Sequence, residues 1–300
     1  MDNPNTTPPV CSYEGSDYQS SFWDNANRRY EDAVETVAIE RLFNRGGKLL
    51  LELGAGAGRL TERYKNWDKI VLLDYSRSQM EQARERLGDG PNYIYVAADI
   101  YKLPFVNALF DGATMIRTLH HMADPALTLC SVRRVLAENS QFLLEFANKR
   151  NLKSIGRWLL GRQKWNPFSP EQVEFVHLNY NFHPKTVIKT LEECGFKNES
   201  SLGVSHFRMD WFKKHIKHER LVKWDASLQN VAPFKNYTPS IFTLNQAVGG
   251  EPQAEGVNFF ACPICGEGLP DAKETQNCPG CGHEWEYKDG IYEFRINPEN

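Results

Sequence analysis

Apolar and polar positions follow helical and strand periods in alternation along the first half of the chain. Residues 28–43 carry apolar side chains at helical spacing, and the run Asn44-Arg45-Gly46-Gly47 ends this predicted helix. Short apolar runs then predict five strands, at 48–53, 69–73, 93–98, 112–116 and 141–146. Helices are predicted between them, at 58–64, 76–87 and 125–136. Strands that alternate with helices through short turns indicate a parallel sheet covered on both faces, which is a doubly wound α/β domain.

The pattern is less regular beyond residue 150. Helices are predicted at 154–160 and 184–194, and a last strand at 241–244. The first 20 residues show no apolar period and predict a loose arm. The predicted divisions are an arm at 1–27, a main domain at 28–247 with a variable region at 150–240, a linker at 248–256 and a tail domain at 257–300.

Composition and charge narrow the class of protein. Apolar residues make up 41% and charged residues 24% of the 300 residues, which is typical of a soluble globular chain. The formal net charge of −3 argues against a globally basic nucleic-acid binder. No run approaches the roughly 18 apolar residues of a membrane span, and the first residues lack the pattern of a signal peptide. We therefore expect a cytoplasmic protein with no membrane partner and no DNA partner.

The most informative segment is a glycine-rich turn after the first strand. Residues 49–58 read Leu-Leu-Leu-Glu-Leu-Gly-Ala-Gly-Ala-Gly. Glycine lets the backbone bend sharply and lie against a ligand, and a helix that starts beyond the turn offers N–H donors. The third glycine of a dinucleotide fingerprint would fall at Arg59, and no Gly-Lys-Ser/Thr of a phosphate loop follows. The spacing therefore fits neither motif, and a glycine turn without a ligand is one alternative.

Acid and glycine at strict alternation, from Glu52 to Gly58, resemble motif I of the class I S-adenosylmethionine (SAM)-dependent methyltransferases. Three later features follow in the order of that family: an acid after the second strand, an acid and an apolar residue after the third, and Leu119-His120-His121 after the fourth. The last segment is similar to that of the type-11 methyltransferases. The resemblance covers about residues 28 to 148 and implies a Rossmann-like methyltransferase sheet with helices on both faces.

The resemblance also implies residues that contact SAM. The turn with Gly54, Gly56 and Gly58 passes beneath the amino-acid portion and the ribose, and Glu52 holds the ammonium group. Asp74 accepts the ribose hydroxyls, and Tyr75 borders the adenine. The other implied cofactor residues are Ala55, Asp99, Ile100 and Arg117, the last of them through its backbone.

Candidates for a general base follow the fourth strand. His120 and His121 are the nearest titratable side chains, and histidine titrates near neutral pH. The alternative is that one caps the next helix and the other lines the cofactor wall. No Asn/Asp-Pro-Pro-Tyr/Phe or Pro-Cys motif is present, which argues against adenine N6, glutamine and pyrimidine C5 methylation. Cys130 is expected to be a small core residue in an amphipathic helix.

Four of the seven cysteines crowd into the tail. Cys262, Cys265, Cys278 and Cys281 form two CPxCG knuckles, a spacing that predicts a structural Zn²⁺ site with four thiolates. The tail is too short for a sturdy core, so the metal would supply folding energy.

The knuckles and the run Lys288-Asp289-Gly290-Ile291 resemble the small zinc-ribbon activator subunit of tRNA, rRNA and release-factor methyltransferases. The resemblance implies a ribbon that pairs with the methyltransferase sheet and stabilises it or grips the substrate. A zinc-bound end that merely packs is the alternative.

Three functions follow from these features. The first is a SAM-dependent methyltransferase that acts on a small metabolite at oxygen, nitrogen or carbon. The second is an RNA or protein methyltransferase in which the ribbon and the basic, aromatic residues 207–224 hold a macromolecule. That segment is otherwise the solvated face of an amphipathic helix. The third is a non-catalytic SAM-binding protein, against which the complete set of cofactor residues argues.

Overall fold

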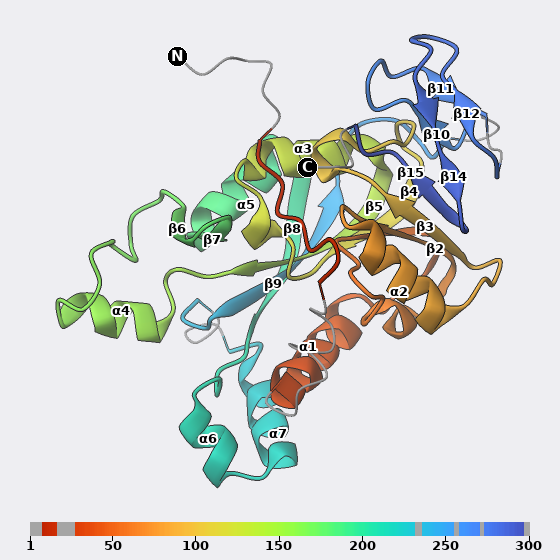
Figure 1. Cartoon of the computed structure of the whole chain (residues 1–300). Helices are drawn as coiled ribbons and strands as arrows, with labels where there is room; N and C mark the ends of the chain where they lie inside the picture. The colour runs from red at the N-terminus through yellow and green to blue at the C-terminus, as the bar shows by residue number, and fades with distance from the viewer. Residues whose placement is uncertain (1–7, 17–27, 232–235, 255–257, 271–272, 297–300) are drawn as a thin grey trace.

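A nine-stranded sheet forms the centre of the molecule in the computed structural model, which describes residues 8–16, 28–231, 236–254, 258–270 and 273–296 (Figure 1). Its strands are β1 (Gly47–Leu53), β2 (Trp67–Asp74), β3 (Tyr93–Ala97), β4 (Phe110–Met115), β5 (Leu136–Ala147), β8 (Phe196–Val204), β9 (Ser240–Ala247), β14 (Tyr287–Lys288) and β15 (Ile291–Glu293). Their order is β14-β15-β3-β2-β1-β4-β5-β9-β8. The strands from β3 to β5 pair in parallel, whereas β9 is antiparallel to both β5 and β8. The α/β fold is confirmed, with a mixed sheet in place of the expected parallel one.

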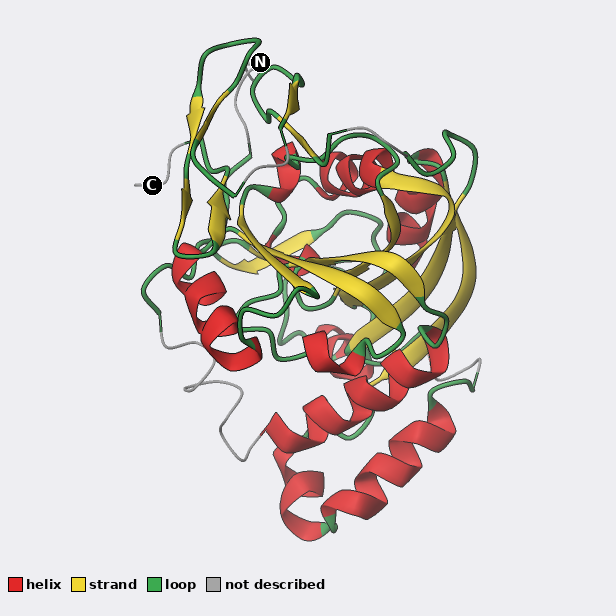
Figure 2. Cartoon of the chain, turned by 90° about the vertical axis from the view of Figure 1, so that its right-hand side faces the viewer, coloured by secondary structure: helices red, strands yellow, loops and turns green. Residues whose placement is uncertain are grey.

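Helices cover both faces of this sheet (Figure 2). One apolar core lies under α1 (Arg29–Leu42), α2 (Arg77–Leu87) and α7 (His218–Leu228), and the other lies under α3 (Pro125–Val135) and α5 (Pro184–Glu193). Successive side chains of a strand point to opposite faces, so β1 sends Leu50 into the first core and Leu49 and Leu51 into the second. Burial on both sides explains why β1 is a continuous apolar run.

The helix predicted at 58–64 is absent. Only one turn of 3₁₀ helix, Thr61–Arg63, lies between β1 and β2. Gly54, Gly56 and Gly58 all have positive φ, at 66°, 53° and 70°, which no α-helix accommodates. Between Gly58 and the start of β2 at Trp67 the chain forms this single turn and no α-helix, so that prediction was wrong.

Several elements of the second half had no signal in the sequence. β8 carries the polar run Asn198 to Ser201, which hides its strand pattern, and the short hairpin of β6 (Val173–Val176) and β7 (Asn179–Asn181) was also missed. The predicted helix at 154–160 is confirmed as α4 (Leu152–Leu159). Residues 207–224 divide into α6 (Asp210–His215) and the first part of α7.

A disulfide joins α3 to the residue that follows α5. Cys130 and Cys194 lie 64 positions apart in sequence, and their Cα atoms lie 4.9 Å apart. Cys130 is exposed, so its predicted place in the core was wrong. The two helices pack side by side, and this proximity is not visible in two isolated cysteines of the sequence.

The tail, described at 258–270 and 273–296, extends the main sheet instead of standing apart from it. The hairpin of β14 and β15 adds to the sheet edge, where β15 runs parallel to β3 with Ile291 opposite Tyr95. Phe260 is 1% exposed and packs against Phe105 and Phe294 at ring-centroid distances of 5.8 and 5.0 Å. The rest of the tail forms two short hairpins, from β10 (Phe260–Ala261), β11 (Gly268–Leu269), β12 (Gln276–Asn277) and β13 (Glu284–Trp285).

The predicted divisions of the chain stay predictions. Residues 1–7 and 17–27 of the arm, 255–256 of the linker, and 257, 271–272 and 297–300 of the tail domain lie outside the described residues. Among the described residues, no helix combines the length and the apolar character needed to cross a bilayer.

Candidate functional site

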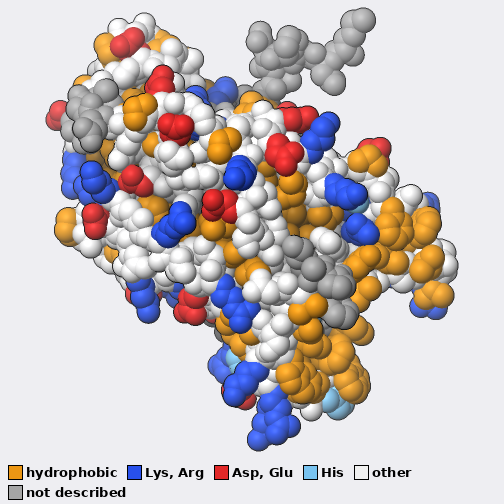
Figure 3. Space-filling model, turned by 180° about the vertical axis from the view of Figure 1, so that it is seen from behind, with side chains coloured by type: hydrophobic (Ala, Val, Ile, Leu, Met, Phe, Trp, Pro, Cys, Tyr) orange, Lys and Arg blue, Asp and Glu red, His pale blue; other side chains and the backbone are white. Residues whose placement is uncertain are grey.

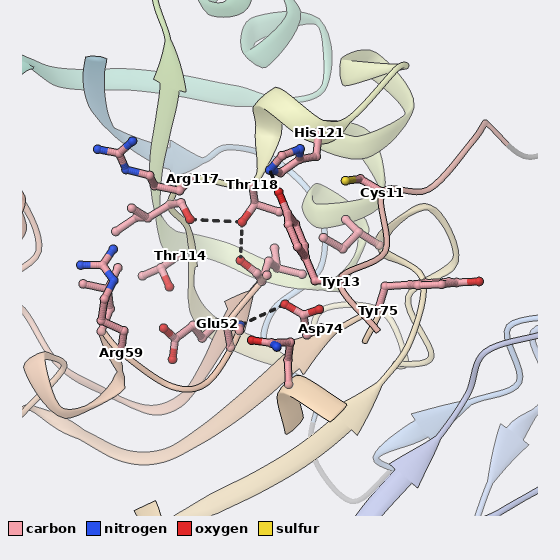
Figure 4. Close-up of a pocket in the computed structure, with 18 of the residues that line it drawn as sticks. Cys11, Tyr13, Glu52, Arg59, Asp74, Tyr75, Thr114, Arg117, Thr118 and His121 are labelled. Carbon is pink, nitrogen blue, oxygen red and sulfur yellow. Dashed lines mark hydrogen bonds between the residues drawn. The ribbon is translucent and has the colours of Figure 1, made fainter. Parts of the chain in front are cut away.

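A pocket opens at the carboxyl ends of the central parallel strands, which is where ligands bind in open α/β sheets (Figure 4). Three neighbouring strands each place a carboxylate on its wall: Glu52 from the end of β1, Asp74 from the end of β2 and Asp99 just beyond β3. Other predicted cofactor residues that line it are Gly54, Ala55, Gly56, Tyr75, Ile100 and Arg117. The structure therefore brings these positions, 65 residues apart at the extremes, into one site.

The first part of the glycine turn, from Gly54 to Ala57, lines this pocket, whereas Gly58, also predicted to contact the cofactor, is not among the lining residues. A Cβ atom on Gly54 would lie 2.1 Å from Oγ1 of Thr118, so a larger residue cannot fit there. The backbone N–H of Gly56 donates to Oδ2 of Asp74 at 2.9 Å, and that of Gly54 donates to the Leu73 carbonyl at 2.8 Å. These bonds hold the turn against the end of β2. Because glycine has no side chain, the backbone of the turn itself faces the pocket.

Glu52 is a buried acid without a full charge partner. Its side chain is 4% exposed, and the hydroxyl of Thr61 donates to Oε2 at 2.6 Å. Burial raises the pKa of Glu52 to about 7, against the opposing effects of the Thr61 hydrogen bond and the Arg59 charge. Because burial penalises the ionised form, a ligand cation at this position would be strongly favoured.

Asp74 and Asp99 combine a structural role with open acceptor capacity. Oδ1 of Asp74 accepts the N–H of Ser76 at 2.9 Å, while Oδ2 accepts that of Gly56. Oδ1 of Asp99 accepts the N–H of Tyr101 at 2.9 Å. Burial raises the pKa of both carboxyls. A carboxylate offers about four acceptor positions, so both residues keep lone pairs for ligand hydroxyl or amino groups.

Arg117 turns its side chain to α1 and leaves its backbone at the pocket. Its φ is 58°, its N–H donates to Oε2 of Glu145 at 2.9 Å, and its guanidinium pairs with the fully buried Glu35. Arg59 also pairs with Glu35. This geometry agrees with the expected backbone role of Arg117, which stays a prediction.

Of the two adjacent histidines, His121 lines the pocket. Its Nδ1 lies 3.1 Å from the Leu178 carbonyl, and its Nε2 lies 3.1 Å from the hydroxyl of Tyr13. A carbonyl only accepts hydrogen bonds, so Nδ1 carries the proton and Nε2 accepts. Burial lowers the pKa of His121, which keeps the ring neutral at neutral pH. The ring of His120 lies 4.0 Å from that of His121, between centroids.

The described part of the N-terminal arm, residues 8–16, is a strap across the pocket, so the prediction of a loose arm was wrong for this segment. Val10, Cys11 and Tyr13 line the pocket, and the N–H of Tyr13 donates to Oγ of Ser76 at 2.8 Å. Glu14 accepts the first two N–H groups of α2 at 2.9 and 3.0 Å. The side chain of Ser76, the residue before α2, makes no capping hydrogen bond, so the Glu14 carboxylate caps the helix, and a negative charge suits a helix N-terminus.

An arginine from the tail fixes the strap in place. Arg295 is 7% exposed, donates to Glu14 at 2.8 Å and forms a two-pronged ion pair with Glu293 at 2.7 and 2.8 Å. Its guanidinium lies 5.7 Å from the ring centre of Tyr75, the residue expected beside adenine. Nothing in the sequence near residues 14 or 295 signals this contact, because it joins the two ends of the chain.

The four tail cysteines meet in one cluster outside the pocket. Their sulfur atoms all lie within 4.8 Å of one another. Cys262 and Cys281 are 3.8 Å apart, and Cys265 and Cys278 are 3.5 Å apart, between sulfur atoms.

Comparison with known proteins identifies the family. Residues 51–144 match the family model described as "Methyltransferase domain". The chain is 34% identical over 178 residues to the ubiquinone/menaquinone biosynthesis C-methyltransferase UbiE of Pseudomonas savastanoi pv. phaseolicola, covering 53% of this chain and 69% of that protein. The chain belongs to the class I SAM-dependent methyltransferases.

Other relatives extend the comparison. The 27-O-demethylrifamycin SV methyltransferase of Amycolatopsis mediterranei is 27% identical over 229 residues, covering 69% of this chain and 76% of that protein. A chain of the structure described as "Complex between the Haloferax volcanii Trm112 methyltransferase activator and the putative methyltransferase" shares the fold with a TM-score of 0.51 and 16% identity, covering 74% of this chain and 92% of that one. The chain spans only 34% to 50% of the length of several further curated relatives.

The raised pKa of Glu52 predicts two linked pH effects. The folded-state pKa lies above the unfolded value, so the unliganded protein should lose stability as pH rises from about 4.5 to about 7, by about 3 kcal/mol relative to Glu52→Gln. SAM affinity should rise over the same range, because the ammonium requires an ionised carboxylate. Urea unfolding and titration calorimetry measure the two effects.

Glu62→Gln, an exposed acid of the same loop, is the control and should keep both pH profiles of the parent. An affinity profile that Glu52→Gln leaves unchanged would show that Glu52 does not bind the ammonium.

Proposed function

We propose that this methyltransferase transfers the methyl group of SAM to a small-molecule acceptor at an oxygen, nitrogen or carbon atom. The observation that supports this most is the wall of three carboxylates beside a neutral histidine in one pocket. Two relatives, a ubiquinone/menaquinone biosynthesis C-methyltransferase and a 27-O-demethylrifamycin SV methyltransferase, are also named for small molecules.

The pocket residues fit SAM by their donor and acceptor chemistry. SAM presents an ammonium, a ribose diol and an adenine amino group, which are all hydrogen-bond donors, and it supplies an electrophilic methyl group when bound. Glu52 would hold the ammonium, Asp74 the diol and Asp99 the adenine side, in the order in which their strands lie in the sheet. The main task left to the protein is alignment of the acceptor with the methyl group.

His121 would receive the proton that an oxygen or carbon acceptor loses. Its Nε2 is the unprotonated ring nitrogen, and its lone pair accepts a hydrogen bond from the hydroxyl of Tyr13. An acceptor hydroxyl that takes the place of the Tyr13 hydroxyl would be positioned for the same contact. The backbone carbonyl of Leu178 fixes the ring orientation through Nδ1.

We further propose that the four tail cysteines hold a structural Zn²⁺. Zinc–thiolate bonds of about 2.3 Å in a tetrahedron separate the sulfurs by about 3.8 Å, close to the 3.5 and 3.8 Å in the cluster. All four ligands are sulfur, so no position is open for catalysis. The ribbon would stabilise the edge strand β3 and, through Arg295, hold the strap over the SAM site. The Haloferax methyltransferase meets its Trm112 activator as a separate chain, whereas here the ribbon is part of the same chain.

A macromolecular acceptor is the second candidate. Residues 207–224 hold six basic side chains against two acids, and Trp211 and Trp224 are exposed at 58% and 47%. Aromatic and basic groups in this arrangement bind single-stranded RNA in other proteins. The formal net charge of −3 for the whole chain favours the small-molecule acceptor. A non-catalytic SAM-binding protein is the third candidate.

Calorimetric titration with SAM, at low and high salt and with and without bulk RNA, tests the proposal. We expect saturable SAM binding that RNA does not change. Asp74→Ala should weaken it by at least about tenfold, because charged hydrogen bonds to the ligand are lost. Asp68→Ala removes an exposed acid from the other end of the same strand and should leave the affinity unchanged.

Each other outcome of this titration has a clear meaning. Binding that RNA strengthens, with a gain that disappears in high salt, would favour the RNA acceptor. No SAM binding at all would contradict the assignment of the pocket.

Removal of the proposed base should affect turnover and not cofactor binding. His121→Ala should lower kcat by about 10² to 10⁴ on an oxygen or carbon acceptor found in a metabolite screen. Its Kd for SAM should stay within about threefold of the parent. His177→Ala, a surface histidine with 87% of its side chain exposed, is the control. Full turnover by both His120→Ala and His121→Ala would exclude a histidine base.

Loss of the metal should destabilise the chain and loosen the SAM site together. The cobalt-substituted protein should show thiolate charge-transfer absorption, and Cys262→Ser should bind less metal, unfold at a lower temperature and bind SAM more weakly. Cys11→Ser, outside the cluster, should retain the metal. Absence of the charge-transfer band would rule out a four-thiolate site.

A further inference from the structure

Exposed apolar side chains concentrate on two projections of the molecule. Of the twelve large hydrophobic residues that are exposed among the described residues, nine lie in residues 150–176, here called the α4 arm, or in residues 207–224, here called the α6–α7 projection. They are Leu152, Leu159, Leu160, Phe168, Phe175 and Val176 of the arm, and Met209, Trp211 and Trp224 of the projection. Single exposed apolar residues are ordinary, whereas two such groups mark an interaction surface.

The helix of the α4 arm turns its apolar face outward. Leu152, Ile155 and Leu159 recur at helical spacing, with Leu152 and Leu159 exposed at 65% and 72%. Within the helix only Ser154 is buried. Lys153 and Arg157, one turn apart, occupy a different side of the helix. A helix with one face of large apolar groups and another of bases is typical of segments that lie in a membrane interface.

Both projections are strongly basic in a chain whose net charge is negative. The α4 arm, residues 150–176, contains five Lys and Arg side chains and two acids, Glu171 and Glu174. Residues 207–224 contain six bases and two acids, and Lys214, Lys217, Arg220 and Lys223 are exposed. The formal net charge of the whole chain is −3, so positive charge is segregated onto these two segments.

The two projections leave the same edge of the sheet, which is the edge that holds the pocket. The α4 arm follows the end of β5 and the α6–α7 projection follows the end of β8, at the carboxyl edge that also holds the pocket. Figure 1 shows α4 and α6 extending away from the sheet, and Figure 3 shows apolar side chains gathered on this part of the surface with Lys and Arg beside them. Residues just beyond the arm reach the site, since the Leu178 carbonyl holds His121.

We propose that the α4 arm and the α6–α7 projection together bind the surface of an anionic lipid bilayer, with the carboxyl edge of the sheet facing it. Leucine and tryptophan side chains would enter the boundary between headgroups and acyl chains, and the bases would lie among the lipid phosphates. Such binding needs no spanning helix, and it differs from the expectation, drawn from the sequence, that the chain has no membrane partner.

Charge and apolar area together favour a lipid bilayer over a second copy of the chain and over RNA as the partner of these two segments. A second copy of the chain would bring two positive surfaces together, which is unfavourable. RNA would pair with the bases and stack on Trp211 and Trp224, but it offers no apolar partner to Leu159 or Leu160.

Co-sedimentation of the full chain with lipid vesicles tests the proposal. We expect binding to vesicles of phosphatidylcholine mixed with phosphatidylserine, weaker binding to phosphatidylcholine alone, and a loss of binding in high salt. The double variant Leu159→Gln/Leu160→Gln should reduce the partition coefficient by at least about tenfold, and Lys153→Gln/Arg157→Gln by at least about fivefold. Tryptophan emission should shift to the blue on binding, since four of the seven tryptophans lie in the two segments.

Two controls separate these segments from the rest of the surface. Leu127→Gln removes an exposed leucine of α3, at 42% exposure, and Arg86→Gln removes an exposed base of α2; both variants should bind like the parent. Circular dichroism and SAM titration of each variant show whether the fold and cofactor site are retained, so a failure here is distinct from a failure of the proposed function. Three results would overturn the proposal: no binding to phosphatidylserine vesicles, binding that both double variants retain, or a dimer in solution that Leu159→Gln/Leu160→Gln converts to a monomer.

Discussion

Parallel pairing of β1, β2 and β3 is the constraint on which the rest of this structure depends. Neighbouring parallel strands end at the same edge, so an acid at the end of each strand reaches the same pocket. Asp74 also has a structural role, because its two oxygens accept the N–H groups of Gly56 and Ser76. The same carboxylate thus fixes the glycine turn on one side and the start of α2 on the other.

The buried carboxylates around the pocket differ in whether an arginine compensates their charge. Glu35 has two arginine partners, Arg59 and Arg117, and they hold its pKa below the usual value in spite of complete burial. Glu52 and Glu145 lack such pairing, and burial raises the pKa of each. The unpaired acid in the pocket is the one expected to meet a ligand cation. An uncompensated buried charge of this kind costs stability and is typical of a functional position.

The tail and the N-terminal strap act on the same site from opposite ends of the chain. Pairing of β15 with β3 extends the sheet beyond the strand that leads to Asp99. Arg295, two residues beyond β15, then reaches Glu14 of the strap and the ring of Tyr75. Stability of the tail and closure of the pocket are therefore connected through one buried guanidinium. The α4 arm and the α6–α7 projection, which are basic and apolar, follow β5 and β8 toward the opposite end of the sheet from the tail.

The sequence by itself determined the features that depend on neighbouring residues. The strand at 48–53, the glycine turn with Glu52, and the paired cysteines of the tail are local patterns, and their backbone requirements can be read from residue type and spacing. Only the tertiary structure decided the strap over the pocket, the role of His121 as the histidine that lines it, the Cys130–Cys194 bond and the outward face of α4. Each of these depends on contacts between residues far apart in sequence, or on which side of a helix finds a neighbour. Periodicity shows that α4 has an apolar face, but only packing shows that the protein leaves that face uncovered.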